Sequence, residues 1–134
     1  MIKVFVKKQS NYPVKATELK KKLSEFFKKQ GIVSDAFVSV ALIGEEKMLD
    51  LSKKYLKDNM LHSVLSFSPD EVKGLSLKQS EFHYPPDDKL DLGEIVICFP
   101  VALEEAKKEG KRINAKIEEL MLPAALHLLG IHHE

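Results

Sequence analysis

The strongest constraint on the fold is a nearly unbroken apolar run from Phe37 to Ile43, in which β-branched residues recur. A strand that buries only one face alternates apolar and polar side chains, whereas a strand covered on both faces is apolar almost throughout. The run is short for a helix, and Gly44 ends it. It therefore predicts a strand that is covered on both faces.

The segments around this run alternate between strand and helix patterns. Residues 2–7 alternate apolar and polar side chains, which predicts a first strand. Apolar residues at helical spacing predict helices that start near residues 17 and 45, at Pro100 and at Ile113, and further strands are expected over 64–67 and 90–99. Residues 70–88 have two adjacent prolines and little periodicity, so we expect a long surface loop or mobile hairpin there.

Length and composition fit one soluble domain that spans residues 1–134. A chain of 134 residues with 44% hydrophobic residues is long enough to build one core. Its apolar runs are shorter than the roughly 18 residues that cross a bilayer, and it begins with a strand pattern instead of a signal peptide. We therefore expect a cytoplasmic protein with no membrane association. Cys98 is the single cysteine, and its apolar surroundings predict a buried, inert thiol.

The charge pattern does not by itself indicate nucleic-acid binding. The formal net charge is only +1, and the lysine clusters, for example at 20–22 and 53–54, are best explained as ordinary solvated helix surfaces. A basic face remains an alternative. Arg112 is the only arginine, so a bidentate guanidinium contact with phosphate must use it or be absent.

The C-terminal segment 123–134 contains a candidate metal site. His127 lies in an apolar helical stretch, Gly130 is expected to end that helix, and His133 follows within six residues of His127. If the chain doubles back at Gly130, the two imidazoles can approach one zinc or nickel ion from different sides. The spacing is similar to the zincin pattern, in which Pro123 would stand at the first histidine.

Pro123 has a second consequence. Proline inside a helix removes a backbone donor and crowds the preceding turn, at a cost of roughly 3 kcal/mol. The sequence therefore predicts that the last helix kinks or restarts near Leu122 and that this changes the direction in which the His127 side chain points.

Three stretches in register resemble the YbeY family, the bacterial single-strand endoribonucleases of ribosomal RNA maturation. Each stretch is similar to a motif of that family, and together they cover nearly the whole chain. They are Leu51-Ser52-Lys53-Lys54-Tyr55 with Val64-Leu65-Ser66-Phe67; Leu92-Gly93-Glu94-Ile95-Val96-Ile97; and Leu126-His127-Leu128-Leu129-Gly130 with His133.

The resemblance implies an α+β fold, with a mixed four-stranded sheet and helices on both faces. It further implies a metal-dependent endoribonuclease with zinc as its cofactor, a single-stranded RNA or ribosomal RNA substrate, ribosomal proteins as possible partners, and no role on DNA. It assigns His127 and His133 as metal ligands and leaves the catalytic residues unassigned. The helix that the family places after this signature is expected to be absent beyond Glu134.

The sequence departs from the family at the site itself. Pro123 replaces the first histidine ligand, and Leu56 replaces an arginine thought to engage substrate. Three residues are candidates for a third metal donor, and the choice stays open: His62, His132 and Glu134.

Two functions of different classes follow from these residues. In the first, the chain is a metal-dependent endoribonuclease, with a metal-bound water as nucleophile and His132 or a nearby group as proton carrier. In the second, it is a catalytically impaired module that binds RNA or the ribosome, and His127 is a structural histidine within the core. A metallopeptidase is the weaker enzyme alternative, because Ala124 stands where the peptidase pattern has its glutamate base.

Overall fold

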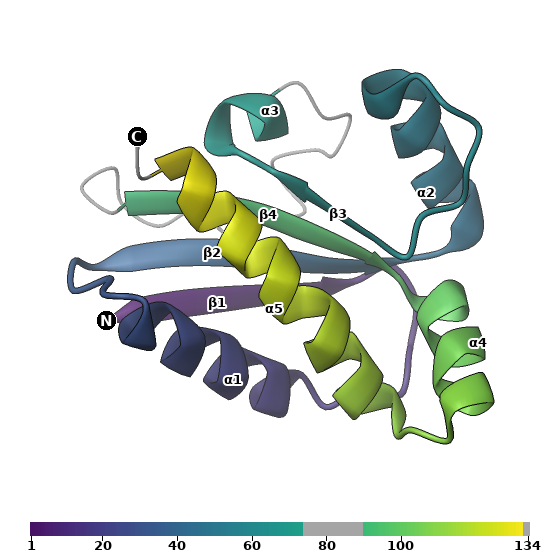
Figure 1. The fold of residues 1–134 in the computed structure, drawn as a ribbon, viewed down its shortest axis with the longest axis horizontal. Coiled ribbons are helices and arrows are strands. Elements are labelled where there is room, and N and C mark those ends of the chain that lie inside the picture. The colour runs from purple at the N-terminus through teal and green to yellow at the C-terminus, as the bar shows by residue number, and fades with distance from the viewer. Residues whose placement is uncertain (74–89, 133–134) are drawn as a thin grey trace.

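The computed structural model describes residues 1–73 and 90–132 and contains one mixed sheet in that part of the chain (Figure 1). Its strand order is β1-β2-β4-β3. β1 pairs with β2 and β2 with β4 in parallel, whereas β3 pairs with β4 antiparallel. The strands are β1 (Ile2–Lys8), β2 (Ala36–Ile43), β3 (Val64–Phe67) and β4 (Leu90–Cys98). The expected mixed four-stranded sheet is confirmed.

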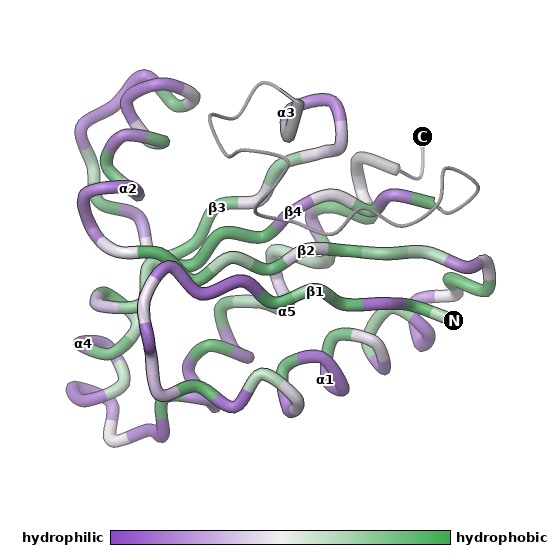
Figure 2. Tube along the Cα trace, turned by 180° about the vertical axis from the view of Figure 1, so that it is seen from behind, coloured by the Kyte–Doolittle hydropathy of each residue, from purple (hydrophilic) through white to green (hydrophobic). Residues whose placement is uncertain are grey.

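Helices pack on both faces of this sheet, as the apolar run in β2 predicted. On one face, α1 (Ala16–Lys29) and α5 (Ile113–His132) pack against side chains that include Val40 of β2. On the other face, α2 (Glu45–Leu51) and the π-helical turn η1 (Ser52–Leu56) pack against side chains that include Ala41. Figure 2 shows the hydrophobic strands β2 and β4 running through the middle of the molecule. β2 is therefore covered on both sides because its alternating residues enter two different apolar clusters.

A short helix, α3 (Pro69–Lys73), forms at the start of the segment where we expected only a loop. Its first turn is stabilised reciprocally: the backbone N–H of Ser68 donates to Glu71 Oε1 at 2.8 Å, and the N–H of Glu71 donates to Ser68 Oγ at 3.4 Å. This is the capping-box arrangement, with proline at the first helical position. The expectation of a loop is thus wrong for residues 70–73, and residues 74–88 lie outside the described part.

α4 (Phe99–Glu109) follows β4 directly and is tied to α5 by a lysine. Lys116 is only 4% exposed, and its Nζ lies 3.3 Å from Glu105, 3.1 Å from Glu109 and 2.9 Å from Glu119. Lys111 also pairs with both Glu109 and Glu119. A nearly buried ammonium is tolerated here because several carboxylates replace its water.

Two further expectations concern Cys98 and the membrane. The Cys98 side chain is buried, and burial raises the pKa of its thiol, which fits an inert core residue. Among the helices that the structure describes, none combines the length and the apolar character needed to cross a bilayer.

Candidate functional site

His127 lies on the exposed side of α5. The buried apolar residues of this helix recur every three to four positions and form one face, which contacts the sheet: Ile117, Met121, Ala124, Ala125, Leu128 and Leu129. His127 and Pro123 are both exposed, one turn apart. The hypothesis of a core histidine is therefore wrong, because solvent reaches the imidazole.

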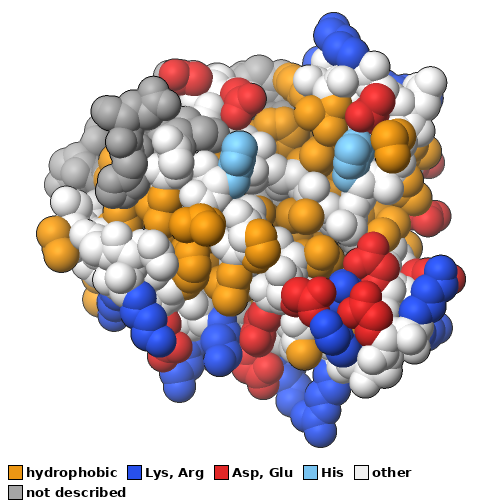
Figure 3. All heavy atoms as spheres, viewed as in Figure 1, with side chains coloured by type: hydrophobic (Ala, Val, Ile, Leu, Met, Phe, Trp, Pro, Cys, Tyr) orange, Lys and Arg blue, Asp and Glu red, His pale blue; other side chains and the backbone are white. Residues whose placement is uncertain are grey.

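The two flanks of α5 face different neighbours. Leu126, Leu129 and Gly130 line a hollow of about 410 Å³ together with Gln30, the residue that ends α1. At 100° per residue, His127 falls on the opposite flank, which faces the edge strand β3. Figure 3 shows histidine side chains, in pale blue, at the surface of the face that α5 covers.

Pro123 does not interrupt α5. The helix is continuous from Ile113 to His132, and the buried residues before and after the proline share one face. The predicted restart near Leu122 is therefore wrong, and His127 keeps the phase of the helix. Proline has no backbone N–H, so one carbonyl in the preceding turn loses its intrahelical donor. Because Pro123 is exposed, that carbonyl faces water, which limits the loss of helix stability.

Gly130 does not end α5 either. Its φ is not positive, and the helix continues to His132, so the predicted turn at Gly130 is wrong. The two residues before it, Leu128 and Leu129, are buried against the core, and that packing outweighs the penalty of about 1 kcal/mol for glycine in a helix. The chain consequently does not double back before His132.

The position of α5 over the sheet is set by a close contact at Gly93 of β4. Gly93 has φ +112°, and a Cβ there would lie 2.5 Å from the carbonyl oxygen of Phe67 and 3.0 Å from Leu128 Cδ2. Only glycine combines this backbone conformation with such a close approach. Gly93 therefore allows Leu128, the neighbour of His127, to pack against the junction of β3 and β4.

The described residues provide only part of a zinc site. A zinc site in a protein needs at least three side-chain ligands. In the ranges 1–73 and 90–132, no group of three or more His, Cys, Asp or Glu side chains is arranged to hold a metal ion. His133 and Glu134 lie outside these ranges, and the side chain of His132 is not described. Of the two predicted ligands, the structure therefore describes only His127, whose accessible imidazole fits that role. Of the three candidate third donors it describes only His62.

A histidine–aspartate pair, His62 and Asp58, lies in the loop between η1 and β3. The sequence analysis named His62 but missed Asp58. His62 Nε2 lies 3.1 Å from Asp58 Oδ2 and 3.4 Å from Oδ1. Both side chains are partly buried, at 28% and 33% exposed. The backbone N–H of Met60 donates to Asp58 Oδ1 at 3.1 Å, and this bond, followed by His62, lowers the pKa of the Asp58 carboxyl.

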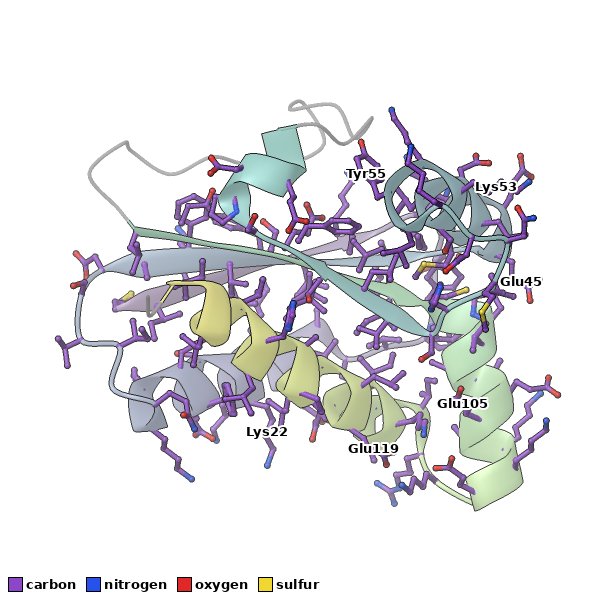
Figure 4. The ribbon with its side chains drawn as sticks, turned by 45° about the horizontal axis from the view of Figure 1, so that its top comes forward. Lys22, Glu45, Lys53, Tyr55, Glu105 and Glu119 are labelled. Carbon is purple, nitrogen blue, oxygen red and sulfur yellow. The ribbon has the colours of Figure 1, made fainter. Side chains whose placement is uncertain are left out.

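The turn η1 and the residue that follows it carry exposed cations and an exposed apolar side chain. Lys53, which Figure 4 labels, is exposed, as are Lys54 and Lys57. Leu56, at the position of the family's arginine, is 43% exposed. Lys54 Nζ lies 5.5 Å from the centroid of the Tyr55 ring. An accessible imidazole on α5 and exposed lysines in and after η1 are together suited to binding an anionic chain.

Comparison with known proteins identifies the family. The sequence model described as "Endoribonuclease YbeY" matches residues 5–134. A protein named endoribonuclease YbeY from Dehalococcoides mccartyi is 34% identical over 99% of this chain and 84% of its own length. A protein of the same name from Acinetobacter baumannii is 32% identical over 90% of this chain and 72% of its own length.

A solved structure supports the fold. The solution structure of TM1509 from Thermotoga maritima matches with a TM-score of 0.56 and 22% identity, over 96% of this chain and 71% of that protein. The resemblance in the sequence motifs is thereby confirmed, and the chain belongs to the endoribonuclease YbeY family.

Proposed function

We propose that this chain is a metal-dependent single-strand endoribonuclease that acts in ribosomal RNA maturation. The observation that carries the proposal is the exposed His127 on the β3 flank of α5, at the second ligand position of the signature in a chain of this family. Because the side chain of His127 is exposed, its imidazole is accessible to a metal ion.

In this proposal zinc is held by His127 and His133, and the third donor is His62, His132 or Glu134. Zinc bound there would polarise a phosphoryl oxygen and lower the pKa of its water. The residues of the chain do the rest: His127 keeps its imidazole accessible on the surface of α5, and the exposed lysines of η1 attract the RNA backbone. A ribosomal RNA substrate would place the reaction in the cytoplasm, with ribosomal proteins as partners.

A specific observation favours a second candidate, a catalytically impaired module that binds RNA or the ribosome. Pro123 occupies the exposed position one turn before His127, where a ligand would be needed, and Leu56 exposes an apolar side chain where the family has an arginine. Both losses leave the fold intact, because both side chains are on the surface.

Metal analysis and RNA cleavage decide between these candidates. Purified protein is analysed for bound zinc and incubated with a labelled single-stranded RNA and with DNA of the same sequence, which lacks the 2′-hydroxyl. For the endoribonuclease we expect bound zinc and cleavage of RNA only, with a loss of at least about 100-fold in His127→Ala. Leu126→Ala is the control, since Leu126 is exposed on the other flank of α5. Intact RNA and no zinc in the unmodified protein would leave only the binding module.

A further inference from the structure

The strand β1 presents two lysines on either side of an aromatic ring. It stands at the edge of the described sheet, in the order β1-β2-β4-β3. Val4 and Val6 enter the cluster under α1 and α5, so alternation along the strand directs Lys3, Phe5 and Lys7 to the opposite face. Lys3 and Lys7 are exposed and Phe5 is partly exposed, and in Figure 2 the hydrophilic stretches of β1, in purple, flank its hydrophobic middle. This face of β1 is therefore a short row of cation, ring and cation.

The Phe5 ring is held in place by its neighbours on β2. Phe37, which is only 8% exposed, meets it edge-to-face, with ring centroids 6.3 Å apart and an interplanar angle of 75°. The residue directly opposite Phe5 in the parallel pairing is Ser39, whose side chain is small and neutral. The ring is thus fixed from one side and partly open to solvent on the other.

An ammonium group already lies over this ring. Lys3 Nζ is 5.7 Å from the centroid of Phe5. A cation–π contact at an exposed site is worth about 0.5–1 kcal/mol, whereas a nucleobase stacked on an aromatic side chain contributes about 1–3 kcal/mol. A base can therefore displace the lysine, whose exposed side chain then turns toward a phosphate.

The charges around this row favour an anionic chain over a second copy of the protein. β1 and β2 contain no acidic residue, and the acidic residues aligned with this face, Asp91 and Glu94, lie on β4, one strand beyond β2. Lysines on an edge strand also discourage pairing with another copy, but that role requires no aromatic ring between them. Lys3 and Lys7 are about 13 Å apart along the strand, so one extended chain reaches both.

We propose that Lys3, Phe5 and Lys7 form a binding surface for single-stranded RNA, in which a base stacks on Phe5 and the two lysines contact phosphates on either side of it. The inference takes its substrate class from the proposed function. α5 packs on the opposite face of the sheet, so this surface adds to RNA binding and takes no part in the chemistry at His127.

The test of the ring measures binding by anisotropy, in EDTA, to a fluorescently labelled single-stranded RNA and to a labelled polyphosphate chain, which has no bases. Phe5→Leu keeps an apolar side chain against Phe37 but removes the ring. We expect it to weaken RNA binding by at least about fivefold and to change polyphosphate binding by less than about twofold. Phe5→Tyr, which retains a ring, is the control and should bind RNA within about twofold of the unmodified protein.

The test of the lysines measures how RNA affinity depends on salt. The double variant Lys3→Gln with Lys7→Gln should lower the slope of log K against log salt by about 1.4, which corresponds to two lost contacts on a single strand. Lys107→Gln with Lys108→Gln, two exposed lysines of α4, is the matched control and should leave the slope unchanged. Because Lys3 and Lys7 are exposed, this variant keeps the test decisive if Phe5→Leu folds poorly.

Three results would overturn the inference. Phe5→Leu could bind RNA as the unmodified protein does, or it could lose the same affinity for polyphosphate as for RNA. The Lys3 and Lys7 variant could show the same salt slope as its control; if it also dimerised in sedimentation, the lysines would act only against strand pairing. Failure of the proposed function is recognised separately: the unmodified protein with zinc then leaves RNA uncut while the binding differences persist.

Discussion

At the scale of single residues, Pro123 and His127 decide how much of the metal site survives. They are exposed one turn apart, so side chains at these two positions point to the same side of α5. A histidine at position 123 would supply the missing donor next to His127. Proline at this position costs helix stability without contributing a ligand.

We therefore expect Pro123→His to bind zinc at least about tenfold more tightly than the unmodified protein, a gain of about 1.4 kcal/mol. Pro123→Ala is the matched control, because it restores the backbone donor without adding a ligand. Both variants should unfold at higher temperature, by calorimetry, but only the histidine variant should gain zinc affinity in a competition titration with a chelating dye. Equal zinc affinity in the two variants would show that His127 is not aimed at a metal.

The two glycines near His127 should respond in opposite ways to alanine. In Gly93→Ala the new Cβ meets the Phe67 carbonyl oxygen at 2.5 Å on a backbone with positive φ, so we expect a loss of about 1–3 kcal/mol in the free energy of unfolding. Gly130 is helical and has open space around it, so Gly130→Ala should gain about 0.5–1 kcal/mol. Urea denaturation measures both. A destabilised Gly130→Ala would indicate that the helix ends at Gly130 after all.

At the scale of elements, local patterns were sufficient for the strands and for most helices. The strand 64–67 was predicted with its observed bounds, and α4 ends at Glu109, just before Gly110, whose left-handed conformation is typical of a glycine that follows a helix. The errors lie where tertiary packing overrides a local preference. Gly130 and Pro123 both signal a helix end, yet the apolar face of α5 is anchored to the sheet on both sides of them.

The candidate site was predicted less completely than the fold. His127 could be selected from a motif, whereas the pairing of His62 with Asp58 depends on the left-handed turn at Lys57, which no propensity of lysine suggests. A histidine four residues after an aspartate was the available signal. It has no meaning until the loop geometry is known.

The link between α4 and α5 should make stability fall in acid. Lys111 and Lys116 lower the pKa of Glu109 and Glu119, below the ordinary value of 4.5. Groups with a lowered folded pKa contribute stability that is complete above the unfolded value and is lost as the pH falls through the folded value. The pKa of Lys116 is raised above 10.5, so its contribution is complete below that pH and is lost only in strong alkali.

We therefore expect the free energy of unfolding to be flat between about pH 6 and pH 9 and to fall below about pH 4.5. Lys116→Met keeps a long apolar stem between the helices and removes the charge (Figure 4 shows Glu105 and Glu119 on the two sides of this junction). Its stability should fall less steeply in acid than that of the unmodified protein, by urea denaturation at each pH. If the free energy of unfolding falls equally steeply in acid for both proteins, then solvent screens the interaction of Lys116 with these partly exposed carboxylates completely.

At the scale of the whole molecule, the fold and the proposed chemistry should be separable by removing metal. Two apolar clusters, one on each face of the sheet, hold the described elements together, and α5 is fixed by its buried face rather than by His127. In small zinc domains the metal supplies the folding free energy, so chelation unfolds them. A four-stranded sheet covered on both faces does not need that contribution.

Treatment with excess EDTA should therefore abolish RNA cleavage while the unfolding temperature changes by less than about 3 °C. RNA affinity in the same buffer should change by less than about threefold, because the exposed lysines of η1 attract the RNA backbone without the ion. Calorimetry, anisotropy and a cleavage assay on one preparation give the three values, and zinc added back is the control for irreversible damage. Cooperative unfolding on chelation would show that the metal contributes to the free energy of folding. It would contradict the exposed position of His127, because an exposed ligand on a helix that is already packed against the sheet contributes little to the stability of the fold.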